Sequence, residues 1–334
     1  MSRIFIHGLG AVSPAGWGVD ALRAALDKNL PLPVQTLARP GWNKPVTVRP
    51  VPPPAARPAF FAHARLRRAS AMSQHTVAAA LEALGPDAIR VQAGELRLGI
   101  IVCMMAGGVA YSRRFYEEVL RDPATASPLI FPETVFNAPA SHLGAYLNSP
   151  VANYTLVGDE GTFLQGLALA ADWLGEGRAD GCVVVGAEEM DWIVADAVRL
   201  FQRETVYAAG AGAVYLNRNP AAAIELAAIT DSFTYTQKQG RLAAAQQMAL
   251  QLPAGAGSEL LCLSESKAFG QPLWPGRRLA PKSVLGEAFV ASAAWQCVAA
   301  GDALRREEFT AANVSIVGVN QQAIGARLQR TNLL

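Results

Sequence analysis

Three glutamates in this sequence lie where apolar runs meet turns or helices, and such corners often present reactive side chains. Glu160 lies in YTLVGDEGTFLQG, which reads as a buried strand running into an amphipathic helix. Glu265 ends the run SELLCLSE, and Glu287 begins the helical stretch EAFVASAAWQCVAAGDAL. Carboxylates can act as general acids or bases or bind hard cations, but they are poor nucleophiles. If the three converge, repulsion raises the pKa of at least one, unless Lys282 or Lys267 pairs with them.

The rest of the chain supplies the elements that would position these side chains. Short apolar runs alternate with helical stretches, which predicts βα units around buried sheets. The Pro-rich residues 40–58 are expected to form an irregular surface segment. The second half repeats the element types of the first, so the sequence predicts an α/β fold. The clearest first-half segments are RIFIHGLGAV, ASAMSQHTVAAALEAL, LRLGIIVCMM and DGCVVVGAEE.

The overall composition narrows the class of protein. The chain has 334 residues, 51% hydrophobic and 17% charged, so we expect a large buried surface and an obligate oligomer. A net charge of +2 without a basic stripe argues against nucleic-acid binding. No uncharged run is long enough for a membrane span and the N-terminus does not read as a signal peptide, so we expect a cytoplasmic protein. The four cysteines lie in apolar runs and are expected to be core residues.

Taken in order, several segments resemble the β-ketoacyl synthases of the thiolase superfamily. These are IFIHGLGAVSPAGWG, RLRRASAMSQHTVAAALEAL, SPLIFPETVFNAPASHLGAYL, GRADGCVVVGAEEMD and AAGAGAVYL. The resemblance runs nearly end to end. It implies a thiolase-like αβαβα five-layered fold of two pseudo-symmetric halves. The halves would be residues 1–217 and a shortened second half, residues 218–334.

The catalytic positions of that family are where this chain departs from it. The resemblance implies a cysteine nucleophile and two histidines. TLVGDEGTFLQG places Glu160 at the cysteine position, LCLSESKAFGQPL offers Glu265 for the first histidine, and APKSVLGEAFVASAA places Glu287 at the second. A carboxylate cannot replace the thiolate, because thioester exchange needs a soft nucleophile and an acyl-glutamate anhydride would hydrolyse. Ketosynthase chemistry by this chain alone is therefore not expected.

The remaining site calls also come from the resemblance. The loop that gates the pocket in the family, Gly-Phe-Gly-Gly, is replaced by GVNQQAIG, residues 318–325. Lys282 and Ser283 match the family's Lys-Ser-x-x-Gly-His motif, and Lys282 joins the three glutamates as a candidate catalytic residue. No cofactor or metal is expected. The expected substrate-binding residues are Phe136, Asn137, Ser283 and Asn320.

Two interpretations of the glutamates stay open. In the first, the site has drifted, and Glu160 persists because a carboxylate is favourable at a helix N-terminus by about 0.3 to 1 kcal/mol. In the second, three separate replacements by the same residue indicate a new acid/base site. A cation site is the weaker form of that idea, because no ligand spacing supports it. His7 and His142 do not occupy catalytic positions, and we expect structural hydrogen bonds from both.

The leading functional hypothesis is a non-condensing ketosynthase-like subunit. It resembles the chain-length factors that pair with an active ketosynthase in type II polyketide pathways, including those that make aryl polyenes. The partner would supply Cys, His and His and exchange acyl chains with an acyl carrier protein. The strand ANYTLV would form the dimer interface, and the segments MMAGGVAYSRRF and PETVFNAPASHLGAY would face the acyl tunnel.

Other functions remain open on the sequence. One is an enzyme that uses Glu160, Glu265 and Glu287 for decarboxylation, hydrolysis or dehydration of an acyl or acyl-carrier-linked substrate. Another is a homodimeric binding protein with no catalysis. Whether the chain is an enzyme thus depends on whether the glutamates form a site.

Overall fold

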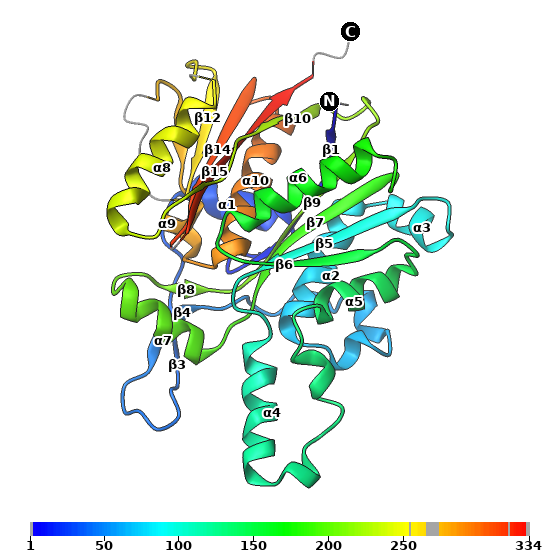
Figure 1. The fold of residues 1–334 in the computed structure, drawn as a ribbon, viewed down its shortest axis with the longest axis vertical. Coiled ribbons are helices and arrows are strands. Elements are labelled where there is room, and N and C mark those ends of the chain that lie inside the picture. Colours follow the sequence, from blue (N-terminus) through cyan, green and yellow to red (C-terminus); the bar gives the residue numbers. More distant parts are fainter. Residues whose placement is uncertain (1–2, 254, 265–273, 320, 332–334) are drawn as a thin grey trace.

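The apolar runs of the sequence form the strands of one large mixed sheet (Figure 1). The computed structural model describes residues 3–253, 255–264, 274–319 and 321–331. The large sheet contains β1 (Phe5–Ser13), β2 (Gly16–Trp17), β5 (Leu98–Met104), β6 (Asn153–Val157), β7 (Gly181–Glu188), β9 (Gly210–Asn217), β10 (Ile224–Ile229), β11 (Phe233–Thr234), β12 (Glu259–Leu263), β13 (Arg277–Leu279), β14 (Ala311–Val317) and β15 (Gln322–Arg330).

The two halves of this sheet have the same strand order. The first half runs β1-β9-β7-β5-β6, and the second runs β10-β15-β14-β12-β13. In each half the outer three strands are parallel, and the two strands nearest the centre are antiparallel to their neighbours. An antiparallel pairing of β1 with β10 joins the halves. The thiolase-like fold of two similar halves is therefore confirmed, while the exact boundary at residue 217 stays a prediction.

Helices form the remaining layers. They are α1 (Val19–Lys28), α2 (Ala71–Leu84), α3 (Asp87–Gln92), α4 (Val109–Arg121), α5 (Ala138–Leu147), α6 (Thr162–Gly175), α7 (Trp192–Phe201), α8 (Lys238–Leu250), α9 (Pro281–Leu285) and α10 (Phe289–Arg305). The central helices α6 and α10 contact strands of both halves, whereas α2 and α5 cover the outer face of the first half and α8 covers that of the second. Nearly every residue of α10 is buried, as expected for a helix apolar on all sides. None of the described helices is long and apolar enough to cross a membrane.

Close packing of α2 on the first strand explains the motif GLG in β1. A Cβ on Gly8 would lie 1.5 Å from the Ala83 carbonyl oxygen, and one on Gly10 would lie 1.9 Å from that of Ala79. Any larger residue would push the helix off the sheet. The two glycines thus set the spacing of the outer layer.

A second, small sheet lies beside the first and reaches the candidate site. It pairs β3 (Gln35–Leu37) with β4 (Val46–Arg49) and β4 with β8 (Tyr207–Ala208). The expectation of an irregular segment over residues 40–58 is wrong for β4. The β-branched stretch Val46-Thr47-Val48 forms a strand before the proline cluster begins.

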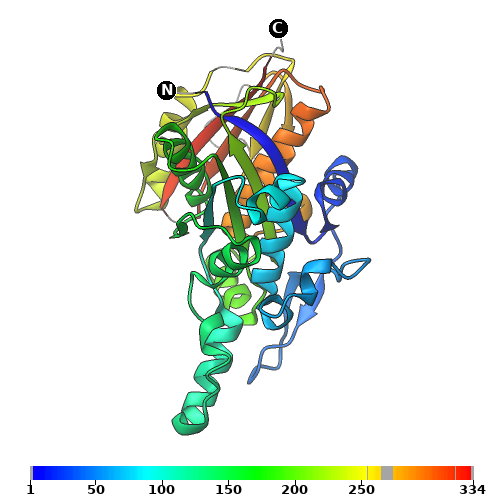
Figure 2. The ribbon, with the colours of Figure 1, turned by 90° about the vertical axis from the view of Figure 1, so that its right-hand side faces the viewer.

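Helix α4 and the turns after it form an arm that extends away from the rest of the molecule (Figures 1 and 2). None of the residues of α4 is buried. The arm continues through the 3-10 turns η3 (Pro123–Thr125) and η4 (Phe131–Glu133) to α5. Its surface carries the exposed apolar side chains Tyr116, Leu120, Leu129, Phe131, Val135 and Phe136.

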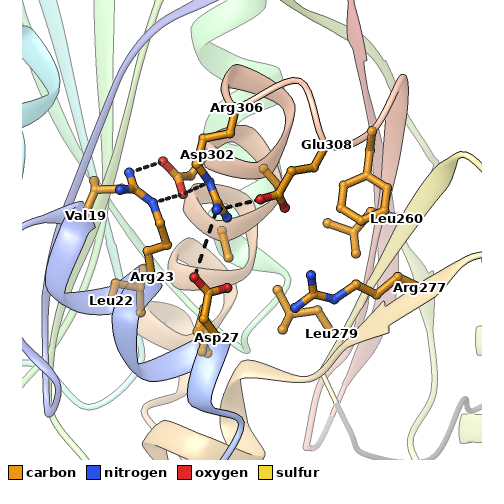
Figure 3. A pocket seen from close by; sticks show the side chains of 14 residues that line it. Val19, Leu22, Arg23, Asp27, Leu260, Arg277, Leu279, Asp302, Arg306 and Glu308 are labelled. Atoms are coloured by element: carbon orange, nitrogen blue, oxygen red, sulfur yellow. Dashed lines mark hydrogen bonds and ion pairs between the residues drawn. The ribbon is translucent and has the colours of Figure 1, made fainter.

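An ion-pair network ties α1 to the C-terminal end of α10 (Figure 3). Asp302 accepts two hydrogen bonds from Arg23, both of 2.7 Å, and pairs with Arg306 at 3.2 Å. Arg306 also pairs with Glu308 at 2.6 Å. The hollow between these side chains measures about 20 Å³, room for one water molecule. The network is therefore a structural joint that leaves no space for a substrate.

Candidate functional site

Lys282 lies between two of the predicted glutamates and binds both. Its Nζ is 2.6 Å from Oε2 of Glu160 and 2.8 Å from Oε2 of Glu287. All three side chains are almost fully buried, with exposed fractions of 12%, 1% and 6% in that order. Burial alone would lower the pKa of Lys282, but the two carboxylates hold it above its ordinary value. The ammonium is thus the cation of this cluster.

Glu160 reaches the cluster from the turn between β6 and α6. The residues after it begin α6, and the Glu160 carbonyl accepts the Phe163 N–H at 3.3 Å. The pKa of Glu160 is raised well above its ordinary value by burial and by the charge of Glu287, against the opposing effect of Lys282. Its Oε1 has no hydrogen-bond partner in the part of the chain that the structure describes. One buried acceptor is therefore left unused.

Glu287 is held at the N-terminus of α10 by its own backbone and side chain. Its N–H donates to the Val206 carbonyl at 2.9 Å, and its carbonyl accepts the Ala208 N–H at 2.7 Å. Its Oε1 accepts the Phe289 N–H at 2.7 Å. Phe289 has a φ of 41°, which is rare for a bulky residue. The carboxylate is thereby fixed in place.

A tight turn brings Lys282 back beside Glu287. Helix α9 ends at Gly286, whose N–H donates to the Lys282 carbonyl at 2.9 Å. Gly286 has a φ of 97°, and a Cβ there would lie 2.7 Å from the Val206 carbonyl oxygen. Glycine is required at this position for both reasons. The matched motif KSVLGE thus builds the turn that the cluster needs.

The cluster contains no soft nucleophile. All four cysteines are buried, and none lines the cavity beside the glutamates. Burial raises the pKa of Cys182 and of Cys262 to about 12, so both stay thiols at neutral pH. Two carboxylates around one ammonium can hold or move a proton, but they cannot carry an acyl group as a thioester.

The cluster opens onto a polar cavity of about 560 Å³. Ser283 lines this cavity and donates its hydroxyl to the Ala280 carbonyl at 2.7 Å. Arginine side chains also reach it, from β4 and from α8. The cavity is lined by Pro31, Arg49, Glu160, Gln202, Glu204, Thr205, Val206, Arg241, Ser264, Lys282, Ser283, Gly286, Glu287 and Val319.

A second, more apolar cavity of about 940 Å³ adjoins the first. Met105, Val109, Val194, Val198 and Phe289 contribute apolar side chains to it. The two cavities share the lining residues Gln202, Glu204, Thr205, Arg241 and Val319. Together they form a polar chamber connected to an apolar one, which suits a ligand with a polar head and a carbon chain.

The residue before Glu160 binds the backbone that follows β14, at the segment matched in sequence to the family's gate. Asp159 accepts the Val319 N–H at 3.2 Å and the Gln321 N–H at 3.0 Å. Gly318 packs on the Asp159 carboxylate so closely that a Cβ would lie 1.9 Å from its Oδ2. The DE pair at residues 159–160 thus has two tasks, with Asp159 holding the loop and Glu160 binding Lys282.

Known proteins resemble this chain in structure and not detectably in sequence. No family model and no curated protein matches the sequence. Among solved structures, the ishigamide ketosynthase/chain length factor matches with a TM-score of 0.78 and 18% identity over 99% of this chain and 100% of that chain. A β-ketoacyl synthase from Burkholderia phymatum STM815 matches with a TM-score of 0.78 and 15% identity over 99% and 100%. A ketosynthase in complex with its chain length factor from Xenorhabdus doucetiae matches with a TM-score of 0.78 and 16% identity, over 99% of this chain and 98% of that chain.

The chain has the β-ketoacyl synthase fold. At these identities the likeness shows the fold alone, so the roles of the site residues depend on their own geometry. In this ketosynthase fold the corner after β6 carries Glu160 and the N-terminus of α10 carries Glu287. The two lie 127 residues apart in the chain, and Lys282 joins them.

The structure locates the other predicted site residues as follows. Ser283 lines the polar cavity. Phe136 and Asn137 lie on the exposed surface where the arm meets α5, and neither lines the two cavities. Glu265, Lys267 and Asn320 lie outside the described residues. The substrate-binding roles therefore stay predictions.

Two buried glutamates at the end of β7 escaped the sequence analysis. Glu188 accepts the N–H groups of Met105 at 2.6 Å and Ala106 at 3.1 Å, and Glu189 accepts that of Ala110 at 3.0 Å. Burial raises the pKa of Glu188 to about 8 and that of Glu189 to about 7. The segment GCVVVGAEE could have indicated them, because carboxylates at the end of a fully buried strand need hydrogen-bond partners. These two hold the base of the arm.

The structural roles expected for two histidines are confirmed. His142 on α5 lies 2.5 Å from Glu133, which also accepts the Ser70 N–H at 2.9 Å. Burial would raise the pKa of Glu133, but these hydrogen bonds hold it below its ordinary value. His7 contacts the Asn219 carbonyl at 2.8 Å. Both histidines join elements of the fold and lie outside the two cavities.

Proposed function

We propose that this chain is a non-condensing ketosynthase-like subunit that pairs with an active, cysteine-containing ketosynthase and shapes its acyl tunnel. The observation that carries the proposal is the Glu160–Lys282–Glu287 cluster. It occupies the corner where the resemblance places the nucleophile and one histidine, and it has no thiol. Condensation would then need the Cys and His residues of the partner.

The outer strand of the sheet supports an interface with such a partner. β6 is the last strand in the sheet order, and its residues are half-buried or exposed. Tyr154 is 47% exposed and Val157 is 52% exposed, an apolar pair on an edge able to accept another strand. The solved structures that match include ketosynthases with chain length factors, which supports a partner of that kind.

The apolar cavity supports the tunnel-shaping part of the proposal. Met105, Ala106 and Val109 line it, and all three belong to the predicted segment MMAGGVAYSRRF. The second predicted segment contributes no lining residue to either cavity, because residues 132–137 continue the exposed arm and α5 begins after them. In the proposed complex the arm would cover the partner's surface, and acyl chains would arrive on an acyl carrier protein. A role in fatty-acid or polyketide-type biosynthesis, aryl polyenes included, follows from this proposal.

Co-purification tests the pairing directly. The chain is co-expressed with the cysteine-containing ketosynthase encoded beside it, and condensation is assayed for each protein alone and for the complex. We expect a one-to-one complex and condensation only when both are present. Tyr154→Lys on β6 should break the complex, whereas Leu30→Lys, a change at a 68% exposed position outside β6, should leave it intact. A stable homodimer that turns over acyl substrates alone would refute the proposal.

A second candidate is an acid/base enzyme acting on acyl or acyl-carrier-linked substrates. The unused Oε1 of Glu160 beside a 560 Å³ cavity favours it, together with the raised pKa of that carboxyl. Glu160→Gln separates the two candidates, because it removes the titratable proton and keeps the size of the side chain. A tunnel-shaping subunit keeps the pathway output in this variant, whereas an acid/base enzyme loses it.

A further inference from the structure

Arg49 carries a buried positive charge that no carboxylate of the described residues balances. The residue is 9% exposed, and its Nε donates to the Leu32 carbonyl at 2.8 Å. Among residues 3–253, 255–264, 274–319 and 321–331, neither terminal nitrogen has a hydrogen-bond or ion-pair partner. Burial lowers the pKa of Arg49, as expected for a cation without a nearby anion.

Other arginines buried to a similar degree are paired. Arg39, with a side chain 10% exposed, lies 2.6 Å from Asp196. Arg327, 12% exposed, lies 2.7 Å from Glu259. A buried charge without a counterion is costly, and proteins retain one chiefly where a ligand supplies the counterion. Arg49 is therefore the exception that needs a functional explanation.

The guanidinium of Arg49 lies at the wall of the polar cavity. Arg49 ends β4 and pairs with Ala208, whose N–H donates to the Glu287 carbonyl at 2.7 Å. Its Nη1 would lie 3.4 Å from a Cβ on Gly286. Arg49 lines the same cavity as Lys282, but Lys282 is already neutralised by two carboxylates. Arg49 is thus a cation of this cavity that can accept an added anion.

The surroundings specify the class of anion. Two terminal nitrogens in one plane match the two oxygens of a carboxylate or a phosphodiester. The unbalanced charge of Arg49 fits a singly charged group, and the nearby Glu160 and Glu287 would repel a second negative charge. The adjoining apolar cavity, which shares Gln202, Thr205 and Val319 with this one, offers room for a carbon chain.

We propose that Arg49 binds the singly charged oxyanion head of an amphiphilic ligand whose carbon chain enters the apolar cavity. This site does not depend on the proposed subunit role. It predicts binding by the isolated chain, whereas the subunit role is tested by complex formation and condensation. Either can fail without the other.

Isothermal titration calorimetry on the full chain tests the site with four probes. Octanoate supplies head and chain, acetate the head alone, 1-octanol the chain alone, and dimethyl phosphate a phosphodiester head. We expect octanoate to bind more tightly than acetate or 1-octanol. If dimethyl phosphate competes with octanoate better than acetate does, the natural head group is a phosphodiester; if acetate competes better, it is a carboxylate.

Two variants assign the binding to Arg49. Arg49→Met should weaken octanoate binding roughly 10- to 100-fold, the loss expected for hydrogen bonds to a charged group. Arg49→Lys keeps the charge without the two-pronged geometry and should give an intermediate affinity, which keeps the test decisive if the methionine variant does not fold. The control is Arg305→Met at the far end of α10, which lines neither cavity. Octanoate affinity unchanged in both Arg49 variants, or 1-octanol binding as tightly as octanoate, would overturn the proposal.

Discussion

The two ends of α10 carry ion-pair clusters of opposite composition. At the C-terminal end, Arg23 and Arg306 surround the carboxylate of Asp302. At the N-terminal end, Glu160 and Glu287 surround the ammonium of Lys282. The first cluster encloses about 20 Å³ and the second borders a cavity of about 560 Å³.

The difference separates a structural joint from a candidate site. Around Asp302 the arginines are 29% and 32% exposed, so water can replace a lost partner. Around Lys282 the partners are almost fully buried, one carboxylate oxygen has no hydrogen-bond partner among the described residues, and there is room for a ligand. Charge pairing alone therefore does not identify a site. Burial, an unused acceptor and open space do so together.

The largest effect should follow from removing the central cation of the buried cluster. Lys282→Met leaves Glu160 and Glu287 buried without a counterion, and we expect a loss of about 3 to 5 kcal/mol in the free energy of unfolding. Chemical denaturation at neutral pH measures it. Lys28→Met, at an exposed lysine at the end of α1, is the control and should change stability by less than about 0.5 kcal/mol. Equal effects of the two changes would show that the cluster is not a buried ion pair.

A pH titration of stability tests the buried glutamates beside the site. The pKa of Glu188 is raised to about 8 in the folded state from an ordinary value of 4.5, so the folded protein holds this proton more tightly than the unfolded chain. The stabilisation by this proton is complete below pH 4.5 and is lost as the pH rises towards 8. The corresponding slope is up to about 1.4 kcal/mol per pH unit.

Glu188→Gln removes that titration and should reduce the slope of unfolding free energy against pH between 4.5 and 8, while the titration of Glu189, whose pKa is about 7, remains. Asp302→Asn at the other end of α10 is the comparison, because its partner Arg23 has a pKa raised above its ordinary value and stays charged throughout this range. A curve equally steep in wild type and Glu188→Gln would exclude Glu188 as its source.

The same Asp302→Asn variant gives the intermediate effect on stability. It weakens the hydrogen bonds from Arg23 and the ion pair with Arg306, and we expect a loss of about 1 to 3 kcal/mol at neutral pH. The loss should be smaller than that of Lys282→Met, because both arginines are partly exposed. Urea unfolding of the two variants measures both losses. A larger loss for Asp302→Asn than for Lys282→Met would contradict the prediction.

The smallest effect should come from Glu160→Gln. Lys282 keeps Glu287 as its counterion, and one buried negative charge is removed. We expect the free energy of unfolding to rise or fall by less than about 1 kcal/mol. Thermal and urea unfolding measure it, with Glu160→Ala as the cavity-forming comparison. A loss above about 3 kcal/mol would mean that the charge of Glu160 is essential to the fold.

The local pattern of apolar residues was sufficient to predict most strands of the fold, but it missed β4. The alternation of apolar runs predicted the strands β5 and β7 because each is buried on both faces. The strand β4 was missed, because the proline-rich composition of residues 40–58 hid three β-branched residues. Arg49 lies in that strand. Arg49 was therefore overlooked, because the composition was judged over the whole of residues 40–58 and not over the short strand within them.

The site was predicted in part. The sequence identified Glu160, Glu287 and Lys282 and anticipated that a lysine could pair with the glutamates. It did not identify Glu188 or Asp159, whose partners are backbone N–H groups on other elements. Backbone donors have no sequence signature, so such contacts become visible only in the folded chain.

The sequence by itself determined the α/β class, which follows from periodicity, and the lack of Cys and His at the positions matched to the family's catalytic residues, which follows from residue identity. The two similar halves were implied by the resemblance. Only the tertiary structure decided that Lys282 bridges Glu160, 122 residues away, and that Arg49 faces their cavity without a carboxylate partner among the described residues. The physical reason is that charge balance in a buried site depends on distances across packed elements. Those distances are set by how the two halves close around α6 and α10.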